Sequence, residues 1–234
     1  MAIRPFLAMT GAEMRNSPQI PEGICWLACH FSPYGLGLSN LPPALPPGSL
    51  LMVDDITPIR CHRADIIAIQ LEQAVDRLGC AGVLLDFQRP DCEAAAGLAA
   101  RLVSALPCPV AVSDLYAREL TCPVFLSAPP CHVPLKEHAA PWKDREIWLE
   151  LSKGAELLTL DQHGCQTEAL PCPPDGGGFE DSALHCHYLT EVREDAAAFT
   201  FWRTHEDLAE LLKAAESNGV TTAVGLYQEL KHFP

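Results

Sequence analysis

An aspartate and a glutamine end one of the most apolar runs of the sequence, in the stretch GVLLDFQRPD (82–91). Alternate side chains of a β-strand share a face, so Asp86 and Gln88 would point the same way. A carboxyl group can hold or protonate a polar ligand, whereas an amide can only donate and accept hydrogen bonds. The pair indicates a polar binding site, and the alternative is an aspartate that bonds the backbone amides of its own loop.

Other apolar runs also end in acidic residues, namely Asp54 in LLMVDD, Asp114 in VAVSD and Glu150 in IWLEL. Two carboxyl groups ~5 to 9.5 Å apart can hydrolyse a glycosidic bond. If the runs are parallel strands around one mouth, Glu150 lies roughly across from Asp86, so these two residues are a candidate catalytic pair. Asp54 and Asp114 are candidate ligand-binding groups at the same mouth.

A metal-dependent hydrolase is the rival interpretation. LHCHY places His185 and His187 on one strand face, a spacing that zinc ligands use. No C-x-x-C pair accompanies the two histidines, and chance enrichment in a chain with 11 cysteines is the better explanation of their spacing. Nothing resembles a Gly-rich phosphate loop or a G-x-S-x-G nucleophile turn. We therefore expect no bound metal and no cofactor.

Short β-rich runs alternate with helical stretches along the chain. We expect barrel strands at 24–30, 50–54, 82–87, 109–113, 123–127, 146–151, 198–203 and 222–227. We expect clear helices at 64–78, 91–105 and 204–218, the last with Thr204 as N-cap and Gly219 as stop signal. Such alternation favours parallel pairing, and eight strands favour an α/β fold, a closed (β/α)₈ TIM-type barrel with some helices reduced. Barrel enzymes build their sites at the carboxyl ends of the strands.

Gly- and Pro-rich sequence interrupts the alternation after the strand expected at 146–151. Two β-rich runs flank the loose stretch CPPDGGGFEDS (172–182). We expect residues 152–192 to form a small β-rich hairpin or flap, inserted between strands six and seven of a single barrel domain that spans 1–234.

Aromatic side chains matter for a sugar ligand because pyranose rings stack on them. Trp148, Trp202 and Tyr227 lie in or just beyond expected strands, and Trp148 shares a strand face with Glu150. We expect these three to contact the ligand, although a core position is the commoner role for any single aromatic residue.

Two stretches resemble a known family. AIQLEQAVDRLGCAGVLLDFQRPDCEAAAGLAARLVSAL (68–106) looks like the central helix–strand–helix of glycoside hydrolase family 18, the chitinase-like barrels. AFTFWRTHEDLAELLKAAESNGVTTAVGLYQEL (198–230) is similar to the closing unit of that family. The resemblance implies a TIM barrel that binds a glycan containing N-acetylglucosamine at its mouth.

The sequence departs from the family signature D-G-x-D-x-D-x-E, which reads AGVLLDFQ at 81–88. By resemblance, Asp86 would hold the N-acetyl group of the substrate, which itself attacks the sugar carbon. Gln88 stands where the family has the glutamate that protonates the leaving oxygen, and Leu84 replaces another aspartate. An amide has no proton to give near neutral pH. The resemblance therefore implies a glycan-binding barrel that is weak or inactive as a hydrolase, with a glycosidase using Asp86 and Glu150 as the alternative.

Composition excludes several partners. A net charge of −14 argues against nucleic acid and anionic membrane surfaces. No apolar run approaches the length that spans a bilayer, and the first residues have too short an apolar stretch for a signal peptide. The odd number of cysteines suits buried thiols in a reducing compartment. We expect a cytoplasmic protein with a carbohydrate ligand.

Overall fold

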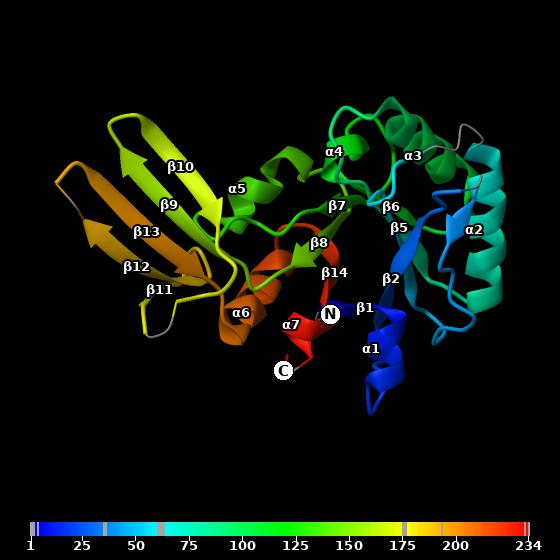
Figure 1. Ribbon diagram of the computed structural model, residues 1–234, viewed down its shortest axis with the longest axis horizontal. Coiled ribbons are helices and arrows are strands. Elements are labelled where there is room, and N and C mark those ends of the chain that lie inside the picture. Colours follow the sequence, from blue (N-terminus) through cyan, green and yellow to red (C-terminus); the bar gives the residue numbers. More distant parts are fainter. Residues whose placement is uncertain are drawn as a thin grey trace.

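Eight parallel strands close into a barrel, as the sequence predicts (Figure 1). The computed structural model describes residues 3, 5–34, 37–59, 64–174, 177–192, 194–231 and 233. Around the barrel the order is β1-β14-β8-β7-β6-β5-β4-β2, and β2 pairs back with β1 to complete the ring. The strands are β1 (Pro5–Met9), β2 (Ile24–Phe31), β4 (Leu50–Asp54), β5 (Gly82–Asp86), β6 (Val110–Ser113), β7 (Val124–Leu126), β8 (Ile147–Leu151) and β14 (Val220–Leu226).

The strand that closes the ring is β1, for which we made no prediction. Leu7 lies beside Ile24 of β2 and also beside Gly225 of β14, so both neighbours of β1 are parallel to it. We expected the run 198–203 to be a barrel strand, and that prediction is wrong. The run belongs to β13 (Ala196–Trp202), whose neighbours are antiparallel and lie in a different sheet. Short apolar runs look alike in sequence, and only pairing with distant strands separates them.

Helices cover part of the outside of the barrel. The long ones are α2 (Ala64–Leu78), α3 (Glu93–Ala105) and α6 (His205–Glu216), close to the predicted ranges. Thr204 caps α6 as expected, in a reciprocal capping box with Asp207. The other helical pieces are single turns or little more: α1 (Gly11–Asn16), α4 (Asp114–Ala117), α5 (Leu135–Ala139), η1 (Ala140–Trp142) and α7 (Tyr227–Leu230).

The strands bury both of their faces, in two separate layers of core. The outer layer lies between the strands and the helices and includes Leu51, Leu85 and Leu71 of α2. The inner layer fills the barrel with nine buried residues: Ala8, Cys25, Leu50, Met52, Leu84, Ala111, Phe125, Trp148 and Val224. Because side chains alternate along a strand, residues two positions beyond Met52 and Leu84 also face the barrel axis. These residues are Asp54 and Asp86.

A second sheet is inserted between β8 and β14 and projects from one side of the barrel (Figure 1). Its five strands are antiparallel, in the order β10-β9-β13-β12-β11. They are β9 (Ala155–Asp161), β10 (Gly164–Ala169), β11 (Phe179–Asp181), β12 (Cys186–Val192) and β13. The β-rich segment thus extends ten residues further than the flap expected at 152–192, because Ala196–Trp202 adds its central strand. A two-residue strand, β3 (Leu38–Ser39), pairs with β2.

The buried side chain of Arg203 ties the inserted sheet to the barrel. Its guanidinium donates hydrogen bonds to the carbonyls of Pro129 (2.7 Å) and Pro130 (3.2 Å), in the loop after β7. It also donates to the carbonyl of His185, which precedes β12, at 3.2 Å. Only 3% of Arg203 is exposed, so water cannot replace these bonds.

We expect Arg203→Ala to lower the free energy of unfolding by at least about 2 kcal/mol, because one buried and two partly buried carbonyls lose their donor. Urea unfolding measures this loss. The control is Lys213→Ala, which removes only an exposed ion pair with Glu210 and should stay within about 0.5 kcal/mol of the parent. Equal, small effects of the two variants would contradict the anchoring role.

Candidate functional site

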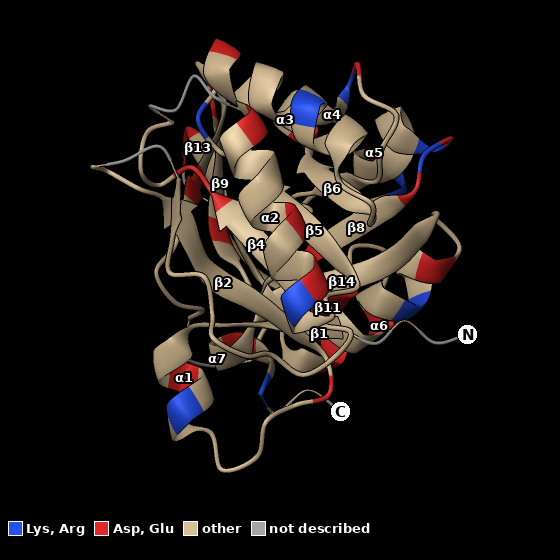
Figure 2. Cartoon of the chain, turned by 90° about the vertical axis from the view of Figure 1, so that its right-hand side faces the viewer, with Lys and Arg blue, Asp and Glu red and all other residues tan. Residues whose placement is uncertain are grey.

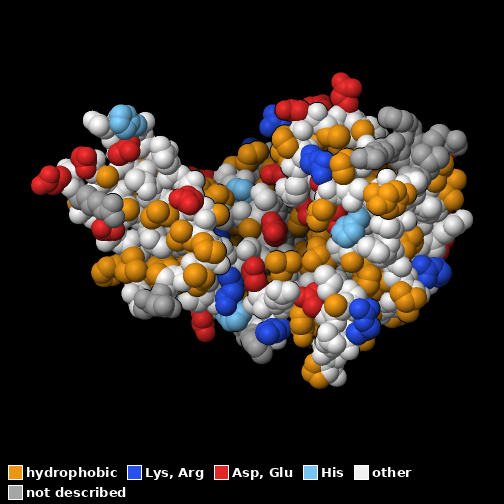
Figure 3. Space-filling model, in the orientation of Figure 1, with side chains coloured by type: hydrophobic (Ala, Val, Ile, Leu, Met, Phe, Trp, Pro, Cys, Tyr) orange, Lys and Arg blue, Asp and Glu red, His pale blue; other side chains and the backbone are white. Residues whose placement is uncertain are grey.

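Polar side chains stand in a row at the carboxyl ends of three adjacent barrel strands. Asp54 ends β4 and lies beside Asp86, which ends β5. His30 of β2 lies beside Asp54 on the other side. For Asp54 and Asp86 the row follows from strand parity, because Met52 and Leu84, two positions earlier, belong to the inner core. Acidic and histidine side chains are visible in the hollow between the inserted sheet and the barrel (Figure 3).

His30 and Asp54 form a close pair. The imidazole Nδ1 of His30 lies 2.6 Å from the carboxylate of Asp54, which also accepts the backbone N–H of Ile56 at 3.1 Å. The pKa of the Asp54 carboxyl is raised by burial, and these two contacts oppose the rise. We had not singled out His30, although it ends the predicted run 24–30. Its type and its place at a strand end are the signal that could have identified it.

The Gln88 side chain folds back onto Asp86, to whose carboxylate its amide N–H donates a hydrogen bond. The pKa of the Asp86 carboxyl is raised to about 6, chiefly by burial. The nearby charges of Glu150, Asp54 and Asp55 also raise it, and the bond from Gln88 opposes the rise. The site thus holds a carboxyl group that is partly protonated near neutral pH, with an amide beside it.

Asp55 has the loop-holding role that was the alternative interpretation of Asp86. Its carboxylate accepts the backbone N–H groups of Gln88 at 2.9 Å and Arg89 at 3.0 Å. Only 3% of Asp55 is exposed. This residue therefore fixes the backbone at the end of β5, which leaves the Asp86 carboxyl available for other contacts.

Glu150 lies on β8 and accepts the backbone N–H of Ala128 at 3.1 Å. Burial raises the pKa of its carboxyl, as do the charges of Glu229 and Asp114. Asp114 begins α4, directly after β6, and its own pKa is raised by burial and lowered by His138. Four carboxyl groups therefore lie at strand ends of one mouth, those of Asp54, Asp86, Asp114 and Glu150. Asp54 and Glu150 raise the pKa of Asp86, and Asp114 raises that of Glu150. Glu229 was not anticipated from the sequence.

The three aromatic residues expected to stack on a sugar lie elsewhere. Trp148 is 4% exposed inside the barrel, and its indole donates to Glu146 at 3.0 Å. Trp202 is 6% exposed in β13 of the inserted sheet, where it stacks on His187. Tyr227 lines a different groove, where its hydroxyl lies 3.3 Å from that of Ser17. Large rings gain most from burial, which accounts for the positions of the two tryptophans.

The two histidines of the metal interpretation are used in structural contacts. The Nδ1 atom of His187 lies 2.8 Å from the carboxylate of Asp207, the residue that completes the cap of α6. His185 has a positive φ of 50° and gives its carbonyl to Arg203. Across the residues that the structure describes, no group of three or more His, Cys, Asp or Glu side chains is arranged to hold a metal ion.

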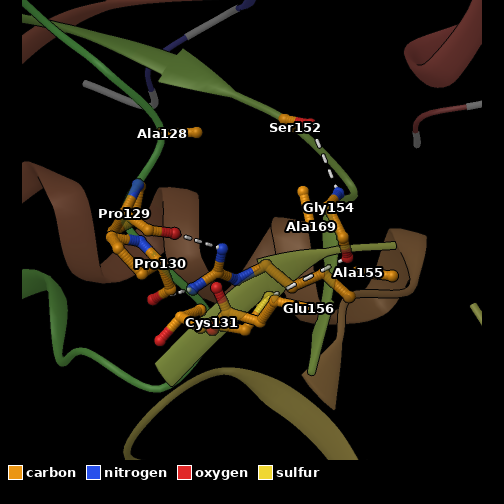
Figure 4. A pocket seen from close by; sticks show the side chains of 11 residues that line it. Ala128, Pro129, Pro130, Cys131, Ser152, Gly154, Ala155, Glu156 and Ala169 are labelled. Atoms are coloured by element: carbon orange, nitrogen blue, oxygen red, sulfur yellow. Dashed lines mark hydrogen bonds between the residues drawn. The ribbon is translucent and has the colours of Figure 1, made fainter. Parts of the chain in front are cut away.

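A cavity of about 300 Å³ lies between the loop after β7, the end of β8 and the inserted sheet (Figure 4). Ala128, whose backbone N–H bonds Glu150, is one of its lining residues. Small apolar residues and a few polar ones line it, among them Ala128, Pro129, Cys131, Ser152, Glu156 and Arg203. Glu156 accepts a hydrogen bond from the backbone of His132 at 2.9 Å and lies 2.6 Å from its Nδ1 atom. The inserted sheet therefore contributes a wall to the space beside the mouth.

Comparison with solved structures places this fold among the chitinases. A chitinase-like agglutinin from Robinia pseudoacacia has a TM-score of 0.57 at 14% identity, with 87% of each chain covered. A class V chitinase from Nicotiana tobaccum, solved in complex with NAG4, has a TM-score of 0.56 at 10% identity, with 96% of this chain and 93% of that chain covered. The spore cortex-lytic enzyme SleL of Bacillus cereus has a TM-score of 0.55 at 10% identity. The match covers 87% of this chain but only 63% of SleL, less than two thirds of its length.

No protein-family profile matches the sequence, and no curated protein is similar to it in sequence. The fold is thus that of a chitinase-like TIM barrel, as the resemblance implies. At these identities the likeness concerns the fold, so the chemistry has to be argued from the residues of this chain.

The raised pKa of Asp86 predicts a pH-dependent stability. The unfolded carboxyl has an ordinary pKa of 3.8 and the folded one about 6. A raised folded pKa contributes stability that is fully present below the unfolded pKa and is lost as the pH rises through the folded pKa. Between about pH 4 and pH 6 the chain should therefore lose up to about 3 kcal/mol through this group.

Asp86→Asn should remove this dependence, so it should be more stable than the parent near neutral pH and similar to it near pH 4. Urea unfolding across this range measures the difference between the two proteins. A difference that stays constant with pH would show that Asp86 has an ordinary pKa.

Proposed function

We propose that this chain binds a glycan containing N-acetylglucosamine at the carboxyl-end mouth of its barrel, and that it hydrolyses that glycan weakly or not at all. The observation that carries the proposal is the Gln88–Asp86 contact. It puts a hydrogen-bonding amide and a half-buried carboxyl side by side at the end of β5. This is the strand where the resemblance places the catalytic signature, and the residue at its acid position is the amide.

The structural neighbours support binding as the retained function. A chitinase from Nicotiana tobaccum was solved as a Glu-to-Gln mutant, and one from Cycas revoluta as a mutant with a Glu-to-Gln and a Gly-to-Trp change, each with a tetrameric N-acetylglucosamine ligand. A glutamine in place of a glutamate is therefore compatible with oligosaccharide binding in this fold. The Robinia neighbour is named as an agglutinin, which fits a barrel that binds sugars.

Gln88 can hold a sugar oxygen but cannot protonate it. Its amide already donates to Asp86 and retains a second N–H and a carbonyl for a ligand. Hydrolysis needs a proton at the leaving oxygen, which a general acid supplies with a gain of typically ~10²- to 10⁴-fold. Gln88 is exposed at the mouth, so a ligand can reach it.

An active glycosidase that uses Asp86 and Glu150 is the second candidate. It is favoured by the raised pKa of both carboxyls, since a carboxyl that is partly protonated near neutral pH, as that of Asp86 is, could act as a general acid. The two groups also influence each other electrostatically, because Glu150 raises the pKa of Asp86. In this case Gln88 would only orient Asp86.

The setting that we propose is the cytoplasm, and it rests on the thiols. All ten cysteines of the described residues are free, and four of them are buried. In the described part of the chain, no helix is long and apolar enough to cross a membrane.

Gln88→Glu is the direct test of the proposal. The variant should raise the hydrolysis of a chromogenic N-acetylglucosaminide by ~10²-fold or more over the parent, because a proton donor is restored. The gain should fall short of ~10⁴-fold, because Leu84 leaves no second aspartate next to Asp86. Adding Asp86→Asn to the repaired variant should abolish the gain.

The opposite pattern would favour the second candidate. If the parent already cleaves the substrate, Gln88→Glu changes nothing and Glu150→Gln stops the reaction, the acid is not at position 88. Calorimetric titration with the N-acetylglucosamine tetramer is the companion measurement. An absence of binding would contradict both the binding proposal and the glycosidase alternative.

A further inference from the structure

The charges of the mouth are unbalanced, and they indicate which glycan fits it. None of the eight barrel strands contains a Lys or Arg, whereas β4, β5 and β8 contribute Asp54, Asp86 and Glu150. In the view of Figure 2, the basic positions of the described residues are scattered over helices and loops. The whole chain has 30 acidic and 16 basic residues. At the strand ends that the structure describes, the mouth therefore carries more negative than positive charge, which attracts cations and repels anions.

Two of the mouth carboxylates have a positive or protonatable neighbour. Asp54 lies 2.6 Å from the Nδ1 atom of His30. Asp114 lies close enough to His138 for that residue to lower its pKa. Their negative charge is thus offset within the protein when these imidazoles are protonated.

Asp86 and Glu150 have no such neighbour. Among the described residues, no Lys, Arg or His lies within ion-pair distance of either carboxylate. Arg89, the basic residue next to Gln88, donates to the carbonyl of Ile56. The charged groups that shift the pKa of the two carboxyls, among the described residues, are all acidic. They are Asp54, Asp55 and Glu150 for Asp86, and Glu229 and Asp114 for Glu150.

Half-buried carboxylates without a counter-charge are costly, and a ligand that brings a positive charge removes part of this cost. A fully acetylated N-acetylglucosamine polymer is neutral and brings none. A glycan with carboxylate substituents adds a further negative charge. A glucosamine unit without its acetyl group carries an ammonium, which is a cation with three hydrogen-bond donors.

We infer that the preferred ligand of the mouth is an N-deacetylated or partly N-deacetylated glucosamine polymer, whose ammonium groups lie against Asp86 and Glu150. This inference rests on the proposed function, since it specifies the chemistry of the glycan at the same site. It also suits Gln88, because an amide next to Asp86 adds no charge of either sign to the mouth.

Two tetramers of equal length provide the test, one of N-acetylglucosamine and one of glucosamine. Calorimetric titration is done in low and in high salt at about pH 6.5, where sugar amines keep much of their charge and the Asp86 carboxyl, with its pKa of about 6, is mostly ionised. At low salt the glucosamine tetramer should bind about tenfold more tightly or better, as expected for one or two added charge contacts. High salt should reduce the difference in affinity between the two tetramers, because dissolved ions screen the attraction between ammonium and carboxylate.

Two double variants separate the site from the general charge of the chain. Asp86→Asn with Glu150→Gln should abolish the preference for the glucosamine tetramer. Glu119→Gln with Glu180→Gln removes the same number of charges at exposed positions, after α4 and on β11, and should keep the preference. Thermal unfolding of both variants checks that each is folded.

The outcomes are distinct. Equal or tighter binding of the acetylated tetramer would overturn the inference and leave the proposed function standing. A preference that persists in the Asp86/Glu150 variant would assign it to the overall charge and also overturn the inference. If neither tetramer binds, the proposed function fails with it.

Discussion

Closure of the barrel by β1 is the constraint on which the rest of the structure depends. This five-residue strand pairs with β14 on one side and β2 on the other. Parallel strands closed in this way bring all their carboxyl ends to one mouth. Glu150 of β8 and Asp86 of β5 belong to different parts of the ring, and they influence each other because the ring is closed. An open sheet would leave them on a long edge, with much of their charge in water.

The mouth is a compromise between burial and charge. Inward-facing positions below it are apolar and tightly packed, so acidic groups can lie only at the last inward position of a strand. At these positions the acidic groups differ in the hydrogen-bond and charge partners that the protein gives them. Asp55 accepts two backbone N–H groups and holds a loop, Asp54 is paired with His30, and Asp86 has only the neutral amide of Gln88. The least satisfied group is the one best placed to interact with a ligand.

The sequence predicted what depends on local pattern. The barrel class, the three long helices and the acidic strand ends all follow from periodicity, capping residues and strand parity. It did not predict β1, whose apolar run is short, or the true place of Ala196–Trp202, because both depend on pairing between distant segments. It also misplaced the aromatic residues, since parity along one strand does not say how deep a ring lies in the barrel. His30 and Glu229 were missed because their importance comes from neighbours on other elements.

The central claim is that the glycan binds where β4, β5 and β8 end. The most direct measurement is an NMR titration of the labelled chain with the N-acetylglucosamine tetramer, following backbone amides and side-chain carboxyl signals. The account predicts that the largest shifts occur at Asp86, Gln88, Glu150 and the amide of Ala128, which bonds Glu150. Shifts confined to the groove lined by Ser17, Tyr227 and Leu230, with the strand ends unchanged, would contradict it.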